Sequence, residues 1–161
     1  MQIGILADSH DNLPNLYKAV EIFNQRGVSH VFHAGDFVSP FTAKPLSKLK
    51  CSMRGVFGNN DGDKLLLREK FNGIGEIHED FYEDTIDDKS IVVIHKEKLV
   101  EKLAQSRRYD VIIYGHTHKV DVREGHPLIV NPGECGGWLG GRSTIAIFDT
   151  DKFQVEVIQL K

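Results

Sequence analysis

The chain has 161 residues, of which 40% are hydrophobic and 27% are charged, and its formal net charge is −3 at pH 7. These values are ordinary for a globular protein, and they argue against a largely disordered chain and against a membrane-spanning one, because the apolar runs are only strand-sized. The absence of a long basic block argues against a binder of long nucleic acids. The length predicts a single domain over residues 1–161.

The first predicted unit consists of a strand, a polar loop and a helix. Residues 2–7 form a short apolar run that reads as a buried strand, and the polar loop 8–12 follows it. Apolar residues then recur at helical spacing from Leu13. Asn12 is the expected cap of this helix and Gly27 its expected end.

Two further units repeat this order. Ser39-Pro40 is predicted to open the second helix, with Phe41, Leu46 and Leu49 as its apolar residues. The third helix is expected to reach about Phe71. The second unit begins with the strand 31–33 and the turn 34–36, and the third begins with the strand 52–57 and the polar loop 58–62.

The second half is predicted to be mostly strand. Residues 76–94 read as an antiparallel excursion with short strands, and one helix is expected over residues 99–107. The other predicted strands are 111–114, 120–122, 128–130, 143–148 and 153–160.

This order predicts an α/β fold in which two stacked, mixed β-sheets are flanked by helices. Open α/β sheets place ligands beyond the carboxyl ends of their strands. The polar clusters of the chain fall at these ends. The candidate ligands are Asp8, His10, Asp36, Asn59, His95, His116 and His118.

Three oxygen donors and four imidazoles suit two divalent ions such as manganese, iron, zinc, nickel or cobalt, and the absence of cysteine disfavours a structural zinc. Two ions about 3.5–4 Å apart can hold a hydroxide between them and promote hydrolysis of a phosphate ester. Each residue alone has a commoner interpretation as a loop cap, a turn residue or a core histidine. However, all of these residues lie at strand ends, and such a coincidence is improbable by chance, so the set as a whole favours metal binding.

The same residues form an ordered motif set that resembles the calcineurin-like metallophosphoesterases, in particular the small archaeal and bacterial phosphodiesterases of the YfcE type. The set comprises Asp8-Ser9-His10, Gly35-Asp36, Gly58-Asn59-Asn60-Asp61, His95 and Gly115-His116-Thr117-His118. The resemblance covers nearly the whole chain. It implies a sandwich of two sheets and a two-metal phosphoesterase site.

The resemblance implies that Asp8, His10, Asp36 and His118 hold one ion, and that Asp36, Asn59, His95 and His116 hold the other. Asp36 would then bridge the two ions, of which manganese is the first expectation. The segment Asn131-Pro132-Gly133-Glu134 is similar to a loop that closes one side of the family's site.

Two positions depart from the family pattern. Larger members carry a histidine that protonates the leaving group where this chain has Asn60, and an amide cannot supply that proton near neutral pH. Weak turnover is expected, because the general acid is lost. Small members often lack this histidine too, so the departure fits the subgroup better than it indicates an inactive enzyme. Lys96 follows His95 where glycine is usual, which puts the geometry of His95 in question.

The expected activity is hydrolysis of small phosphodiesters, with His116 and His118 helping to balance the developing charge. One alternative is a non-catalytic, metal-binding scaffold of the same fold, as in the retromer subunit. Another is cleavage of short or cyclic nucleotides, although no basic groove or aromatic ladder supports it. The expected partner is a small phosphoester, with neither long nucleic acid nor membrane, and a homo-oligomer is left open.

The two cysteines bear on the cellular location of the protein, and Cys135 and Trp138 each have two possible roles. Cys51 and Cys135, in a chain that starts without a secretion-type segment, predict a reducing compartment and a cytoplasmic location. Cys135 is either a reactive thiol or, more commonly, a buried inert one. Trp138, among several glycines, either stacks an aromatic group or packs at an edge or a subunit contact.

Overall fold

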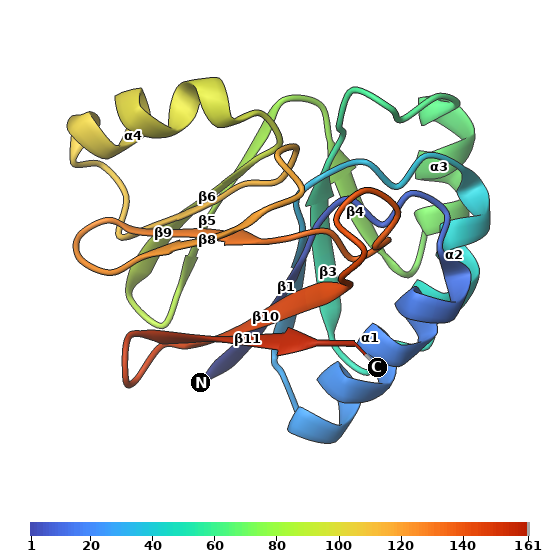
Figure 1. Ribbon diagram of the computed structural model, residues 1–161, viewed down its shortest axis with the longest axis horizontal. Coiled ribbons are helices and arrows are strands. Elements are labelled where there is room, and N and C mark those ends of the chain that lie inside the picture. Colours follow the sequence, from blue (N-terminus) through green and yellow to red (C-terminus); the bar gives the residue numbers. More distant parts are fainter. Residues whose placement is uncertain (161) are drawn as a thin grey trace.

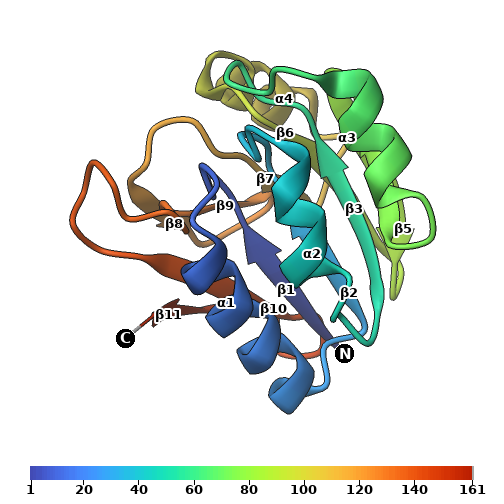
Figure 2. The same ribbon diagram turned by 90° about the vertical axis from the view of Figure 1, so that its right-hand side faces the viewer.

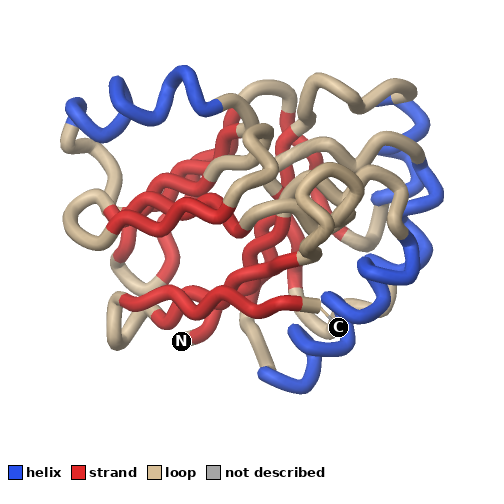
Figure 3. Tube along the Cα trace, viewed as in Figure 1, coloured by secondary structure: helices blue, strands red, loops and turns tan. Residues whose placement is uncertain are grey.

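The computed structural model describes residues 1–160 and contains two β-sheets that pack face to face between layers of helices (Figure 1, Figure 3). This confirms the predicted α/β fold. The first sheet has the strand order β11-β10-β1-β2-β3-β4, and the second has the order β5-β6-β7-β9-β8.

The strands of the first sheet are β1 (Gln2–Leu6), β2 (His30–His33), β3 (Ser52–Val56), β4 (Gly75–His78), β10 (Thr144–Asp149) and β11 (Gln154–Gln159). Those of the second are β5 (Phe81–Ile86), β6 (Lys89–Ile94), β7 (Val111–Ile113), β8 (Val120–Arg123) and β9 (Leu128–Pro132). The helices are α1 (Leu13–Arg26), α2 (Ala43–Leu46), α3 (Lys64–Phe71) and α4 (Val100–Ser106), with 3₁₀ turns η1 (Pro40–Thr42) and η2 (Glu97–Leu99).

Three apolar clusters hold these layers together. One lies between the two sheets, and a second lies between the first sheet and helices α1, α2 and α3, which cross its outer face (Figure 2). A third lies under α4 on the second sheet. No helix within residues 1–160 is long and apolar enough to cross a membrane.

Strand direction places the loops that matter for function. Strands β1, β2, β3 and β4 run parallel to one another, and so do β6, β7 and β9. Parallel strands share a carboxyl edge, so the loops that follow β1, β2 and β3 emerge together, as do those that follow β6 and β7. These are the loops with the predicted ligands.

The ends of α1 agree with the sequence prediction. The Asn12 side chain accepts a hydrogen bond from the Asn15 backbone N–H, and Gly27 ends the helix with a left-handed φ of 63°. The Asn12 side chain also donates to the Gly136 carbonyl at 2.7 Å. The cap of α1 is therefore tied to the loop between β9 and β10.

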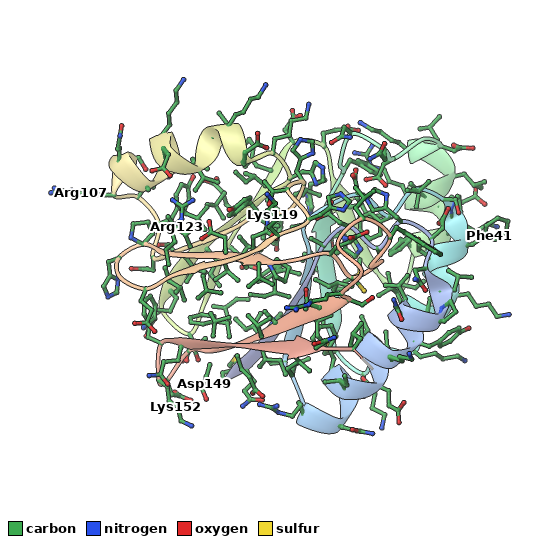
Figure 4. The ribbon with its side chains drawn as sticks, in the orientation of Figure 1. Phe41, Arg107, Lys119, Arg123, Asp149 and Lys152 are labelled. Atoms are coloured by element: carbon green, nitrogen blue, oxygen red, sulfur yellow. The ribbon has the colours of Figure 1, made fainter. Side chains whose placement is uncertain are left out.

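The second predicted helix is shorter than expected. Instead of one helix to Leu49, the chain forms the 3₁₀ turn η1 and the single turn α2. Pro45 lies inside this segment, and it has no N–H to donate to the carbonyl of residue 41, which interrupts a regular helix. Phe41, predicted as an apolar helix residue, is 74% exposed and projects from the molecule (Figure 4).

The prediction of an antiparallel excursion over residues 76–94 is wrong for its first strand. β4 pairs in parallel with β3 and forms the edge of the first sheet, whereas only β5 and β6 form an antiparallel hairpin. The physical reason is that α3 connects β3 to β4, and a helical crossover returns the chain in the same direction. The two residues Glu79-Asp80 then carry the chain from one sheet to the other.

Candidate metal centre

Five strand ends, from both sheets, bring the predicted ligands to one place. Asp8 and His10 follow β1, Asp36 follows β2, Asn59 follows β3, His95 follows β6, and His116 and His118 follow β7. The backbone N–H of His116, from the second sheet, donates to the Asp8 carboxylate, from the first, at 3.0 Å. The carboxyl edges of the two sheets therefore meet at this site.

The first group of ligand atoms is compact. Asp8, His10, Asp36 and His118 each offer one ligand atom within 4.8 Å of the others. The Nε2 atom of His10 lies 3.5 Å from Asp36 Oδ2, and Nε2 of His118 lies 3.6 Å from Asp8 Oδ1. These four residues can hold a metal ion, and they coincide with the set that the resemblance assigns to one ion.

The second group surrounds the other oxygen of Asp36. The Nε2 atom of His95 lies 3.5 Å from Asp36 Oδ1 and 3.0 Å from Asn59 Oδ1. The rings of His95 and His116 are 5.1 Å apart between centroids. Asp36 therefore approaches one group through Oδ2 and the other through Oδ1, which is the arrangement that a bridging carboxylate needs.

The electrostatics of the site suit a bound cation. Asp8 and Asp36 are 0% and 1% exposed, and among residues 1–160 their only ion-pair partners are histidines. Burial, together with the nearby charge of Asp36, raises the pKa of Asp8 to about 8. Burial also lowers the pKa values of His10 and His95, which favours the neutral imidazoles that metals require.

Five of the seven predicted ligands have an unusual backbone conformation. Their φ angles are 50° at Asp8, 41° at His10, 60° at Asp36, 70° at His116 and 59° at His118. A positive φ costs a side-chain-bearing residue roughly 1–2 kcal/mol. Backbone hydrogen bonds between the loops hold this conformation, including His10 N–H to the Asp36 carbonyl at 3.1 Å. The loops are strained, and the strain is part of how they converge.

Two glycines of the motifs are required by close approach. A Cβ at Gly35 would lie 2.5 Å from His95 Nδ1, and this glycine has a φ of 93°. A Cβ at Gly58 would overlap the Asp36 carboxylate. Both positions must lack a side chain so that the ligands can occupy their places.

Two buried residues that support the site were not assigned a role from the sequence. Asp61 accepts hydrogen bonds from the backbone N–H groups of Gly58, Asp36 and Val38, and so joins the loops after β2 and β3. Its place in the Gly58–Asp61 motif was the available signal. His33 is fully buried, with Nε2 2.9 Å from Ser9 Oγ and Nδ1 accepting from the Gly35 N–H. A histidine ending a buried strand carries no signal of its own.

Asn60 lies against the shared carboxylate. Its backbone N–H donates to Asp36 Oδ1 at 2.8 Å, and its side-chain amide donates to Asp36 Oδ2 at 2.7 Å. These contacts orient Asp36, a role that the sequence did not indicate. The expected consequence of Asn60 for the leaving group stays a prediction.

Lys96 does not displace His95. Its side chain is exposed, while His95 is 3% exposed and its Nδ1 donates to the Ala34 carbonyl at 2.8 Å. Lys96 instead lines a cavity of about 700 Å³ beside the second ligand group. Asn59, His95, Phe57 and Leu99 also line this cavity, which offers polar and apolar surface next to the site.

The end of β9 and the loop after it close one side of the site. The Asn131 side chain donates to the Gly115 carbonyl at 2.9 Å and so fixes the turn that carries His116 and His118. Cys135 is fully buried, and burial raises the pKa of its thiol to about 12, which favours the inert interpretation. Trp138 is 65% exposed, and its indole N–H donates to the His10 carbonyl at 3.0 Å.

Comparison with known proteins places these features in context. The family sequence model of the calcineurin-like phosphoesterase superfamily domain matches residues 1–152. A phosphodiesterase of Methanocaldococcus jannaschii is 43% identical over the full length of both chains. A solved structure of an archaeal phosphodiesterase, also 43% identical, has a TM-score of 0.94 and covers 99% of this chain and 100% of its own.

Two more distant structures share the fold. The Escherichia coli phosphoesterase YfcE is 18% identical, with a TM-score of 0.68 and full coverage of both chains. Vps29 of Entamoeba histolytica in complex with zinc is 16% identical, with a TM-score of 0.73 and coverage of 99% and 98%. At this level of identity the likeness concerns the fold alone.

Proposed function

The chain belongs to the calcineurin-like phosphoesterase superfamily, and on that basis we propose that it is a metal-dependent phosphodiesterase that hydrolyses small phosphodiesters. The observation that carries this proposal is the contact of one buried carboxylate, Asp36, with ligand-type atoms of two groups through its two oxygens. The similarity to an archaeal phosphodiesterase favours diesters over monoesters as substrates.

The residues present fit a pair of divalent ions. Asp8, His10 and His118 would hold one ion and Asn59, His95 and His116 the other, with Asp36 shared. Manganese is our first choice, because this mixture of imidazole and oxygen ligands suits it, although nickel, zinc, iron or cobalt would also fit. Two such ions supply Lewis acidity and a water that is deprotonated near neutral pH.

The protein's own groups orient the substrate. His116 and His118 lie 35% and 14% exposed at the mouth of the site, where their rings can help to balance charge at the phosphorus. The cavity beside Asn59 and His95 is the place for one organic arm of the diester. Asn60 donates to Asp36 and offers no acidic proton, so the leaving oxygen departs without a general acid from this position.

A non-catalytic, metal-binding scaffold of the same fold is the rival interpretation. Asp8 and Asp36 are buried side by side without a lysine or arginine partner among residues 1–160, which favours a bound cation in either case. A scaffold, however, would not need ligand residues for a second ion. The full ligand set therefore favours the enzyme. We further expect it to act in the cytoplasm on small phosphoesters.

The deciding experiment is a hydrolysis assay on metal-stripped protein reconstituted with each divalent ion in turn. We expect bis(p-nitrophenyl) phosphate to be cleaved faster than p-nitrophenyl phosphate, with manganese among the most effective ions. Asp8→Asn is the matched negative control, because it keeps the shape of the side chain. Full metal occupancy without hydrolysis of any ester in the panel would favour the scaffold.

A further inference from the structure

Each histidine of the His116–His118 pair has a glutamate behind it that is not among the predicted ligands. Nδ1 of His118 lies 3.4 Å from Glu134 Oε1, on the side of the ring opposite to Nε2, which faces Asp8. Nε2 of His116 lies 3.7 Å from Glu97 Oε2. We infer that Glu134 and Glu97 are positioning residues that fix the orientation and the tautomer of these two ligands, an inference that rests on the proposed metal centre.

Glu134 is built as a fixed acceptor. Its side chain is buried, and its two oxygens accept hydrogen bonds from the backbone N–H groups of Trp138, Leu139 and Gly140 at 2.6 to 3.2 Å. A carboxylate held by three N–H groups stays ionised and cannot rotate freely. Glu134 also makes an ion-pair contact with His118 Nδ1, and no hydrogen bond joins these two side chains.

Unpaired atoms mark the same two contacts. Within residues 1–160, three buried side-chain atoms lack a hydrogen-bond partner, and two of them are His118 Nδ1 and Glu97 Oε2. A buried polar atom without a hydrogen-bond partner destabilises the folded protein. Closing each gap by a few tenths of an ångström would pair His118 with Glu134 and His116 with Glu97, so the structure is one small side-chain adjustment from satisfying both.

These contacts select which ring nitrogen is free for a metal. If His118 donates Nδ1–H to Glu134, its Nε2 lone pair faces the first group. If His116 donates Nε2–H to Glu97, its Nδ1 is the available ligand atom. His95 follows the same rule with a backbone carbonyl, since its Nδ1 lies 2.8 Å from the Ala34 oxygen. A carboxylate partner additionally makes an imidazole a stronger ligand than a carbonyl does.

The two glutamates therefore act on different ions. Glu134 supports His118 and the first group, whereas Glu97 supports His116 and the second. Loss of such a partner typically lowers metal affinity about 10–100-fold. Glu97 also lies two residues after His95 and directly after Lys96, so this support comes from the same segment as a ligand of the second group.

The test compares Glu134→Gln and Glu97→Gln with the wild type and with the control Glu124→Gln, which changes an exposed glutamate before the turn between β8 and β9. Metal-stripped proteins are titrated with Mn²⁺ by calorimetry. We expect each site variant to weaken one of two binding events about 10–100-fold and to leave the other unchanged, and the control to match the wild type.

Nitrogen-15 NMR of the histidine rings gives a second readout that needs no metal. In the metal-free wild type, His118 is expected as the Nδ1–H tautomer and His116 as the Nε2–H tautomer, and each preference is expected to weaken only in its own variant. Fluorescence of Trp138, the single tryptophan, shows whether Glu134→Gln has disturbed the loop. The experiment with Glu97→Gln does not depend on the loop around Trp138, because Glu97 lies in η2.

The possible failures are distinguishable. If the wild type bound no Mn²⁺, the proposed metal centre itself would be wrong. Two Mn²⁺ ions bound with unchanged affinity by both glutamine variants would leave the metal centre standing and overturn the role of Glu97 and Glu134. A weakened first ion with an altered Trp138 signal and an unchanged His118 tautomer would assign Glu134 to loop structure, which also overturns its positioning role.

Discussion

Asp36 is the residue on which both ligand groups depend. Its oxygens face His10 on one side and His95 on the other. We predict that Asp36→Ala weakens both binding events for Mn²⁺, whereas His118→Ala weakens mainly one, because His118 contacts only the first group. Calorimetric titration with metal analysis measures this. Equal and mild losses in the two variants would contradict a shared carboxylate.

Asn60 makes a separate prediction about leaving groups. An acidic phenol departs as a stable anion, but an alkoxide needs a proton, and general-acid catalysis contributes about 10²–10⁴-fold. The wild type should therefore prefer aryl to alkyl diesters. Asn60→His should raise kcat/KM for the alkyl diester alone.

The structure also supplies the control for this experiment. Histidine at position 60 keeps the backbone hydrogen bond to Asp36 but loses the side-chain one. Asn60→Ala loses the same contact without adding an acid, so it separates the two effects. A fall in rate for both esters in both variants would show that the contact of the Asn60 side chain with Asp36, and not the leaving group, determines the effect of this position.

Residue types at strand ends were sufficient to predict which side chains gather at one place, because carboxylates, amides and imidazoles rarely cluster there without a reason. That they bind metal stays a prediction. The supporting residues were not predictable in the same way. Glu134, Glu97 and His33 contact residues of other loops. Glu134 lies in the segment Asn131-Pro132-Gly133-Glu134, but that segment did not indicate a contact with His118. Nothing in the immediate neighbours of Glu97 and His33 distinguishes them from ordinary polar residues.

At the scale of elements, Asp110 joins β7 to β6. Its carboxylate accepts hydrogen bonds from the Ser90 backbone N–H and hydroxyl, both at 2.8 Å. These bonds, the backbone one foremost, lower the pKa of Asp110. A lowered folded-state pKa stabilises the protein above the unfolded pKa of about 3.9, and this stabilisation is lost as pH falls through the folded-state value.

We therefore predict that Asp110→Asn lowers the free energy of unfolding at pH 7, and that its difference from the wild type shrinks below about pH 4. Asparagine imitates the protonated acid, so the two proteins should converge in acid. Urea unfolding across this pH range measures the difference. A difference that stays constant with pH would mean that the ionised carboxylate contributes nothing.

Helix ends were predictable where a local signal exists, as at Asn12 and Gly27. Strand partners were not. Glu79-Asp80 resembles a hairpin turn, yet β4 and β5 belong to different sheets. A two-residue connection reports only that the chain changes direction, and the apolar surface available in each sheet decides which strand is paired.

At the scale of the molecule, the candidate metal centre lies where the carboxyl edges of the two sheets meet. A ligand that binds only the folded chain stabilises it by RT ln(1 + [L]/Kd), about 2.7 kcal/mol at a concentration of 100 Kd. We predict that the melting temperature rises with Mn²⁺ concentration and falls when a chelator is added. Differential scanning calorimetry measures this shift.

The Asp36→Ala variant is the control for metal-dependent stability. It should melt at a temperature that Mn²⁺ does not change, since both ligand groups lose their common member. A wild-type melting temperature insensitive to Mn²⁺ would show that the folded chain has no preference for the ion over the unfolded chain.

The left-handed backbone at the ligands has an evolutionary consequence. Glycine adopts a positive φ without strain, and asparagine does so more readily than most residues. Replacement of His118 or Asp36 by glycine would relieve backbone strain while removing a ligand. Random substitution filtered by folding alone is therefore expected to erode the candidate metal centre, because glycine at these positions would be favoured by folding and would bind no ion.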